Sequence, residues 1–231
     1  MSKILVIFDI DGTLLYSNKV DSQCFADTYK RIYKQEFPTI DWNKYPHVVD
    51  DVIFRHVIKN EFNRTPEDSE VNDFQKAFAE CILEKRRTDP YEFLEVPNAL
   101  NTMNYLLQQE NYLVGIGTGG WHLPATIKLN HLGFDFKKVK LSGADGRNSR
   151  EEIIQIVIDD AKTKHQIERI TYIGDAPWDV RTTRNMKMNF VGIRRNGDRH
   201  TLLEMGASHV LPNYQNRTKF LEALHQSTPP K

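Results

Sequence analysis

The chain has 231 residues, with 31 lysines and arginines against 31 aspartates and glutamates, so its formal net charge is zero. This balance excludes a general electrostatic attraction to nucleic acid or to an anionic membrane, and we expect neither as a partner. The two cysteines, Cys24 and Cys81, are too few for a disulfide framework and too far apart for a metal knuckle. We therefore expect reduced thiols in a cytoplasmic protein. The apolar run at the N-terminus is too short for a signal peptide or a membrane span.

Apolar runs along the chain predict the strands of a parallel sheet. Residues 4–8 are all apolar and mostly β-branched, which is typical of a strand covered on both faces. Further runs of this kind occupy residues 112–116, 170–173 and 190–193, with a weaker one at 139–141. Apolar residues at helical spacing lie between them, at 99–110, 124–132, 151–164 and 179–186. Strands that alternate with helices predict a doubly wound α/β sheet.

Residues 17–95 interrupt this alternation. They contain no convincing strand, and they carry long helical patterns at 21–34, 48–62 and 68–87. Pro90 and Pro97 bracket the return of the chain to the sheet, because a helix is expected to stop before a proline. The sequence therefore predicts a core formed by residues 1–16 and 96–231, with an all-helical domain, residues 17–95, inserted into it.

Carboxylates gather where the predicted strands end. Asp9 and Asp11 follow the first strand, Thr118 follows the second, and Asp175 and Asp179 follow the strand at 170–173. Ligands of parallel sheets bind outside the carboxyl ends of the strands, so the four carboxylates should converge. Mg²⁺, which prefers oxygen ligands, would relieve their repulsion. The spacing of Asp9 and Asp11 places both on one side of an extended chain.

Each of these signals alone also fits a structural role. Acidic pairs are common in solvated turns, Thr118 could cap a helix, and Trp121 and Trp178 beside the motifs could line a pocket or simply pack. Gly12 allows a tight turn, whose backbone N–H groups can bind an anion. The joint occurrence of the signals at successive strand ends favours a catalytic site.

Two segments, DIDGT at residues 9–13 and GDAPWD at 174–179, carry a resemblance to a known family. With Thr118 and a basic residue between them, the chain resembles the haloacid-dehalogenase-like superfamily over nearly its whole length. It is most similar to the phosphoglycolate-phosphatase-like branch. The resemblance implies a Rossmann-like core and a helical C1-type cap inserted after the first motif.

The resemblance also implies roles for individual residues. Asp9 would be the nucleophile that forms an aspartyl-phosphate, and Asp11 would be the general acid and base. Thr118 and the Gly119 N–H would bind the phosphoryl oxygens. Gly12 and Thr13 are further substrate-binding candidates. The implied metal ligands are Asp9, the backbone carbonyl of Asp11, Asp175, and Asp179 either as a ligand or as a carboxylate behind the ligands.

The chain departs from the family pattern at one position. The family usually has a lysine before the helix that leads to the strand at 170–173, and this chain has GADGRNSREEII there. Arg150, 25 residues before Asp175, fits best, and Arg147 is the alternative. Either guanidinium could neutralise a phosphoryl group and Asp9. Both could instead form surface pairs with Glu151 or Glu152.

The predicted function is a Mg²⁺-dependent phosphatase that hydrolyses a small phosphomonoester through an aspartyl-phosphate. A phosphomutase of the same fold would use the same residues, and a non-catalytic phosphate-binding protein is a further alternative. The expected partner is a small phosphorylated metabolite, whose identity the sequence leaves open. We expect a monomer or a homodimer, with substrate selectivity residing in the insert.

Overall fold

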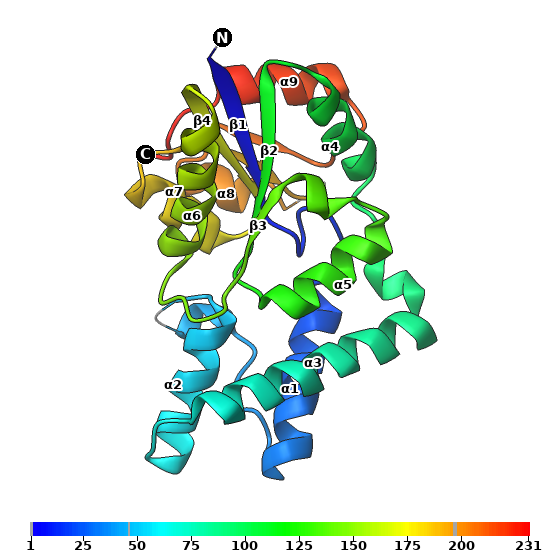
Figure 1. The fold of residues 1–231 in the computed structure, drawn as a ribbon, viewed down its shortest axis with the longest axis vertical. Coiled ribbons are helices and arrows are strands. Elements are labelled where there is room, and N and C mark those ends of the chain that lie inside the picture. The colour runs from blue at the N-terminus through cyan, green and yellow to red at the C-terminus, as the bar shows by residue number, and fades with distance from the viewer. Residues whose placement is uncertain (1, 46, 196–197) are drawn as a thin grey trace.

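The computed structural model describes residues 2–45, 47–195 and 198–231, which form a six-stranded sheet whose neighbouring strands are all parallel (Figure 1). The strands, in chain order, are β1 (Lys3–Phe8), β2 (Tyr112–Gly117), β3 (Lys140–Ser142), β4 (Ile167–Gly174), β5 (Asn189–Ile193) and β6 (His209–Leu211). Their order across the sheet is β3-β2-β1-β4-β5-β6, so β1 lies between β2 and β4. The predicted doubly wound α/β fold is confirmed.

Helices cover both faces of this sheet. They are α4 (Ala99–Gln108), α5 (His122–Leu132), α6 (Arg150–Lys164), α7 (Pro177–Asn185), α8 (His200–Glu204) and α9 (Arg217–Gln226), with a short 3₁₀ turn at η3 (Phe136–Lys138). Val6 and Phe8 of β1 pack with α4, α5 and α9, whereas Leu5 and Ile7 pack with α6, α7 and α8. Because both faces of β1 are buried, the strand is apolar at every position but its first.

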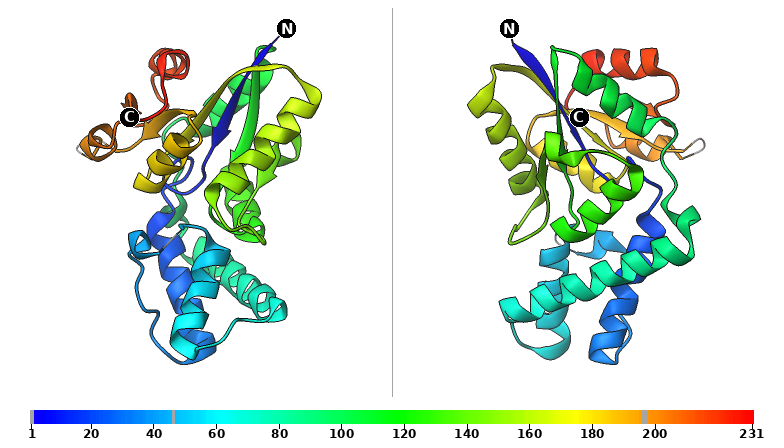
Figure 2. Two further views of the ribbon diagram at one scale, coloured as in Figure 1. Left: turned by 90° about the vertical axis from the view of Figure 1, so that its left-hand side faces the viewer. Right: turned by 45° about the vertical axis from the view of Figure 1, so that its right-hand side comes forward.

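The helical insert lies as a separate layer below the sheet, as the views in Figure 2 show. Its helices are α1 (Asn18–Tyr33), α2 (Asp50–Phe62) and α3 (Asp68–Thr88), with 3₁₀ turns at η1 (Trp42–Lys44) and η2 (Pro90–Phe93). Its two connections to the core run side by side: Tyr16 N donates to Leu94 O and Val96 N donates to Leu14 O, each at 2.8 Å. The insert has the predicted all-helical character, and its boundaries at 16/17 and 95/96 stay a prediction.

Trp121 joins the core to the insert. This fully buried side chain follows β2, yet its ring stacks on Phe25 of α1 with centroids 5.7 Å apart. Phe54, Phe74 and Phe78 of the insert surround the same ring. Trp121 therefore packs rather than lining a pocket, and the aromatic cluster holds the insert against the sheet.

The short elements near the C-terminus were not predicted. Neither β6, α8 nor α9 was expected from the apolar pattern.

Cys24 and Cys81 are both free thiols, with their Sγ atoms 2.7 Å apart. Within the described ranges, each helix is too short or too polar to span a lipid bilayer.

Candidate active site

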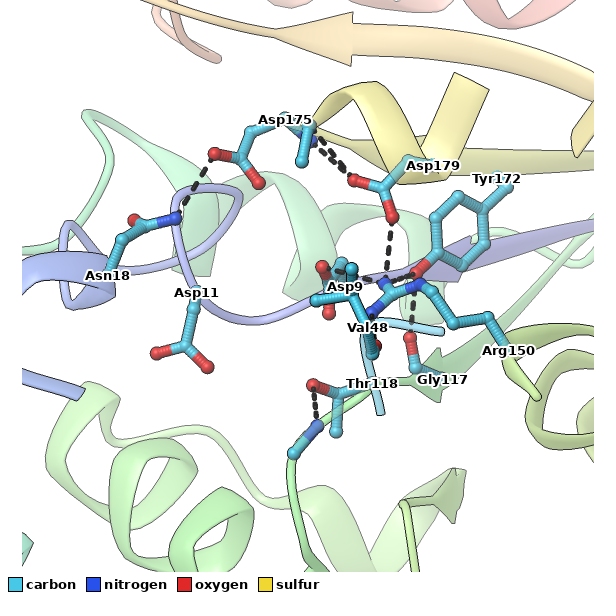
Figure 3. Close-up of polar contacts among 12 residues, drawn as sticks. Asp9, Asp11, Asn18, Val48, Gly117, Thr118, Arg150, Tyr172, Asp175 and Asp179 are labelled. Atoms are coloured by element: carbon cyan, nitrogen blue, oxygen red, sulfur yellow. Dashed lines mark hydrogen bonds and ion pairs between the residues drawn. The ribbon is translucent and has the colours of Figure 1, made fainter. Parts of the chain in front are cut away.

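The candidate active site lies at the carboxyl ends of β1, β2 and β4, on the side of the core that meets the helical insert (Figure 1). Figure 3 shows how its side chains lie relative to one another. Asp9, Thr118 and Asp175 each directly follow one of these strands, and Asp179 lies in the first turn of α7. One carboxylate oxygen from each of Asp9, Asp175 and Asp179 lies within 4.8 Å of the other two. The sheet therefore brings three of the four strand-end carboxylates together.

Asp9 is almost completely buried, with 4% of its surface exposed. Its Oδ2 accepts a hydrogen bond from Arg150 Nη2 at 3.0 Å, whereas its Oδ1 has no partner among the described residues. The pKa of Asp9 is raised, because burial outweighs the lowering effect of Arg150 and the Asp11 carboxylate adds to it. A buried oxygen without a partner costs about 1–3 kcal/mol, which a ligand on that side would offset.

Arg150 is the first residue of α6, and its guanidinium is buried beneath the site. It donates through Nη2 to Asp9 Oδ2 (3.0 Å), Asp179 Oδ1 (2.7 Å) and the Tyr172 hydroxyl (2.8 Å), and through Nη1 to Val48 O (3.3 Å). Burial by itself lowers the pKa of Arg150, but these acidic neighbours outweigh it and raise the pKa. Of the two arginines considered, Arg150 reaches the site, while Arg147 is exposed on the preceding loop.

Asp179 is fully buried, and protein donors bind both of its oxygens. Oδ1 accepts from Arg150, and Oδ2 accepts from the backbone N–H groups of Asp175 and Ala176, each at 3.0 Å. Burial raises the pKa of Asp179 to about 7, against the lowering effect of Arg150. Asp175 is less buried, and its Oδ2 accepts from Asn18 Nδ2 at 3.2 Å. Asp179 is therefore suited to orient Arg150 and the loop that carries Asp175.

Gly12 makes the tight turn after β1 possible. Its φ is +75°, and a Cβ at this position would lie 2.0 Å from Asp175 Oδ2. A larger residue would be strained by its backbone conformation and would collide with the carboxylate. The glycine thus allows Asp175 to approach the loop that carries Asp9 and Asp11.

A buried lysine, Lys128 of α5, holds Asp11. Lys128 Nζ lies 2.7 and 2.8 Å from the two oxygens of Asp11, and it also pairs with Asp21 of α1. Ser17 Oγ donates to Asp11 Oδ1 at 2.6 Å. Burial by itself lowers the pKa of Lys128, but the two carboxylates outweigh it and raise the pKa. This ion pair therefore joins a carboxylate of the core to one of the insert.

The insert also contacts the loop after β2. Asp50 N donates to Gly119 O at 2.8 Å, and Trp121 N donates to Asp50 Oδ2 at 3.1 Å. A Cβ on Gly119 would lie 2.3 Å from Arg150 Nη1 and 2.4 Å from Val48 O, so this close approach requires glycine. The insert is thus closed against the loop that carries Thr118.

A cavity of about 520 Å³ lies between the core and the insert. Of the predicted site residues, those that line it are Asp9, Asp11, Thr118, Gly119, Arg150 and Asp175. Trp178 lines it as well, which was one of its two expected roles. Gly12 and Thr13 lie in the turn behind Asp11, and the Thr13 side chain is fully buried. The cavity has the size of a site for a small molecule.

Four residues near the site were missed in the sequence: Asp21, Asp50, Lys128 and Tyr172. A signal for Lys128 was present, because it is the one charged residue in the segment HLPATIKLNHL. It stands three residues after Ala125 and four before Leu132, on the apolar face of a helix. Asp21 and Asp50 carried no comparable signal, since acidic residues near a helix start are ordinary.

The sequence matches the family model for haloacid dehalogenase-like hydrolases over residues 6–193. The chain belongs to this family. A comparison with curated proteins finds no significant match. Among solved structures, a hydrolase from Pseudomonas syringae is similar with a TM-score of 0.72 and 20% identity, over 96% of this chain and 98% of that one.

Two further solved structures have the same fold. A variant of CbbY from Rhodobacter sphaeroides, in complex with xylulose-(1,5)bisphosphate, has a TM-score of 0.69 and 12% identity over 94% of this chain and 96% of that one. A predicted phosphatase from Clostridium acetobutylicum has a TM-score of 0.66 and 16% identity over 96% of this chain and the whole of its own. At these identities the likeness shows the fold alone.

The haloacid dehalogenase-like site fits a small, hard cation such as Mg²⁺. Asp9, Asp175 and Asp179 offer only oxygen atoms, close to one another, which is the kind of ligand that Mg²⁺ prefers. Burial raises the pKa of all three carboxyl groups, and the charges of neighbouring carboxylates add to this effect. The donor set therefore suits magnesium.

Proposed function

We propose that this protein is a Mg²⁺-dependent phosphatase that hydrolyses a small phosphomonoester through an aspartyl-phosphate on Asp9. The observation that carries this proposal is the state of the Asp9 carboxylate at the cavity wall. Arg150 fixes its Oδ2, whereas its Oδ1 has no partner among the described residues. A carboxylate with one oxygen held and the other free is prepared for nucleophilic attack.

Hydrolysis would take two steps. Asp9 Oδ1 attacks the phosphorus atom, the bond from phosphorus to the leaving oxygen breaks, and Asp11 donates a proton to that oxygen. Asp11 then takes a proton from a water molecule that attacks the aspartyl-phosphate, which releases inorganic phosphate and restores Asp9. Ser17 and Lys128 hold Asp11 within this wall of the cavity.

The other core residues bind the phosphoryl group. Thr118 and Gly119 line the cavity, so the Thr118 hydroxyl and the Gly119 N–H would bind the phosphoryl oxygens, and Arg150 offsets the negative charge around Asp9. Asp9, Asp175 and the Asp11 carbonyl would hold Mg²⁺, which when bound neutralises charge on the phosphoryl group. Asp179 keeps Arg150 in place.

A phosphate-release assay with p-nitrophenyl phosphate tests the proposal. Activity should require Mg²⁺, disappear in EDTA, and be poorly supported by Ca²⁺, which prefers more ligands and longer bonds. Asp9→Asn should lower the rate by about 10³-fold or more. Asp135→Asn is the matched control, because Asp135 is an exposed carboxylate paired with Lys138, and it should keep the rate. Full turnover in EDTA or by Asp9→Asn would contradict the proposal.

The same assay separates the alternatives. A phosphatase releases one inorganic phosphate for each ester consumed, whereas a phosphomutase returns the phosphoryl group to an isomer of its substrate. A phosphate-binding protein would release none.

A further inference from the structure

The wall that the helical insert contributes to the cavity is acidic. Asp21 of α1 and Asp50 of α2 both line it. Burial and then the charge of Asp21 raise the pKa of Asp50 well above its ordinary value. The two carboxylates line the same cavity, where Asp21 is paired with Lys128 and Asp50 has no cation partner among the described residues. Asp50 Oδ2 accepts a hydrogen bond from Trp121 N, and no donor is described for its Oδ1.

The cations near this cavity are already engaged. Arg150 donates to carboxylates of the core and to the Val48 carbonyl. Lys128 lies between two carboxylates. Lys19 stands at the rim, where its side chain is 88% exposed and its Nζ lies 3.6 Å from Glu92. Among the described lining residues, none presents a free, buried positive charge to a second anionic group of a substrate.

An independent observation shows where a ligand would enter the same cavity. Asp9 is nine-tenths buried or more, lines the core wall, and has an unpartnered Oδ1. A phosphoryl group bound there directs the rest of the ester toward the wall formed by the insert. Apolar side chains line that wall beside the two carboxylates: Ile40, Trp42, Val48 and Ile53.

We propose, building on the phosphatase function, that the leaving group of the substrate carries an ammonium group that binds at Asp21 and Asp50. The ammonium would relieve the repulsion between these carboxylates, and the carbon chain would pack on Trp42 and Ile53. A leaving group with a carboxylate or a second phosphoryl group would meet like charge instead. The wall thus selects aminoalkyl phosphates over phosphoglycolate and over sugar bisphosphates.

Three esters of similar size test this inference: O-phosphoethanolamine, propyl phosphate and phosphoglycolate. The value of kcat/KM for O-phosphoethanolamine should exceed that for propyl phosphate at least about tenfold, since a hydrogen bond to a charged group adds this much. Phosphoglycolate should be the poorest of the three. Asp50→Asn should bring the ratio of the first two close to one. Asp73→Asn, a neutralised exposed carboxylate of α3, is the matched control and should keep the wild-type ratio.

The outcomes separate this inference from the function on which it rests. If the wild-type protein cleaves p-nitrophenyl phosphate but treats propyl phosphate as well as O-phosphoethanolamine, or prefers phosphoglycolate, the ammonium site is wrong and the phosphatase stands. If no ester is cleaved, both fail. The wild-type ratio alone decides when Asp50→Asn does not fold, and an unchanged ratio in a folded Asp50→Asn protein overturns the assignment.

Discussion

The substitution Lys128→Met removes a buried charge while keeping most of the volume of the side chain. The Lys128 side chain is 2% exposed, and its Nζ contacts both oxygens of Asp11 and one of Asp21. Methionine would fill most of the space of the lysine but would leave two carboxylates without their counter-charge. The substitution therefore tests whether this ion pair fastens the insert to the core.

The structure sets the expected size of the effect. Removing one partner of a buried ion pair costs about 3–5 kcal/mol, because the remaining charge stays buried and uncompensated. The side chains of Asp11 and Asp21 are each 20% exposed, so water can partly solvate them and the lower end of this range applies. A loss of about 3 kcal/mol is a large part of the 5–15 kcal/mol that stabilises a typical domain. Urea denaturation followed by circular dichroism measures it.

Two further variants make the result specific. Lys76→Met removes a lysine that is 68% exposed and pairs with Asp73 on the surface, and it should change the unfolding free energy far less. Adding Asp21→Asn to Lys128→Met should recover part of the loss, because one of the two unpaired charges is gone. A loss below about 1 kcal/mol in Lys128→Met, or no recovery in the double variant, would refute the reasoning.

Three other measurements address separate parts of the molecule. In EDTA, melting temperature should fall from about pH 4 to about pH 7, because burial raises the Asp179 pKa from 3.8 to about 7 and the folded state keeps a proton that the unfolded state releases. A rise would contradict this sign. Gly119→Ala should lower kcat and reduce the free energy of unfolding by about 1–3 kcal/mol, since the alanine Cβ would overlap Arg150 Nη1. If kcat and the unfolding free energy stay at their wild-type values, the packing around Gly119 is looser than the structure indicates. Diamide should oxidise Cys24 and Cys81 to a disulfide and consume both thiols in a thiol titration; retention of both would exclude the bond.

The sheet was largely predictable because its central strands are buried on both faces. Residues 4–8 form an unbroken apolar run because β1 lies in the middle of the sheet, where both of its faces are buried. The strand β6 escaped prediction because it has three residues, including a half-buried histidine at its start. Three residues are too few to show a hydrophobic pattern, and β6 is a strand because it pairs with β5.

The residues of the candidate site also fall into a predictable group and an unpredictable one. Asp9, Thr118 and Asp175 could be located because each follows a strand, and strand ends of a parallel sheet converge. Asp50 could not, because its place depends on how α2 is docked. The apolar segment around Lys128 signals a buried lysine, but its carboxylate partners depend on how α5 and α1 are docked. That docking follows from tertiary packing around Trp121, which no local pattern records. Prediction therefore reached the residues fixed by topology and missed those fixed by packing between the two layers.

The contacts of Arg150 give a physical reason for an arginine at this position. A guanidinium presents five donors in a plane, whereas an ammonium presents three from one atom. Nη2 of Arg150 binds Asp9 and Asp179, and Nη1 reaches across to the Val48 carbonyl of the insert. A lysine could serve the carboxylates but would have no second nitrogen for Val48. Because one planar group makes both sets of contacts, moving the insert away from the core would disturb the side chain that orients the Asp9 carboxylate. Arg150 thus connects the backbone of the insert directly to the proposed nucleophile.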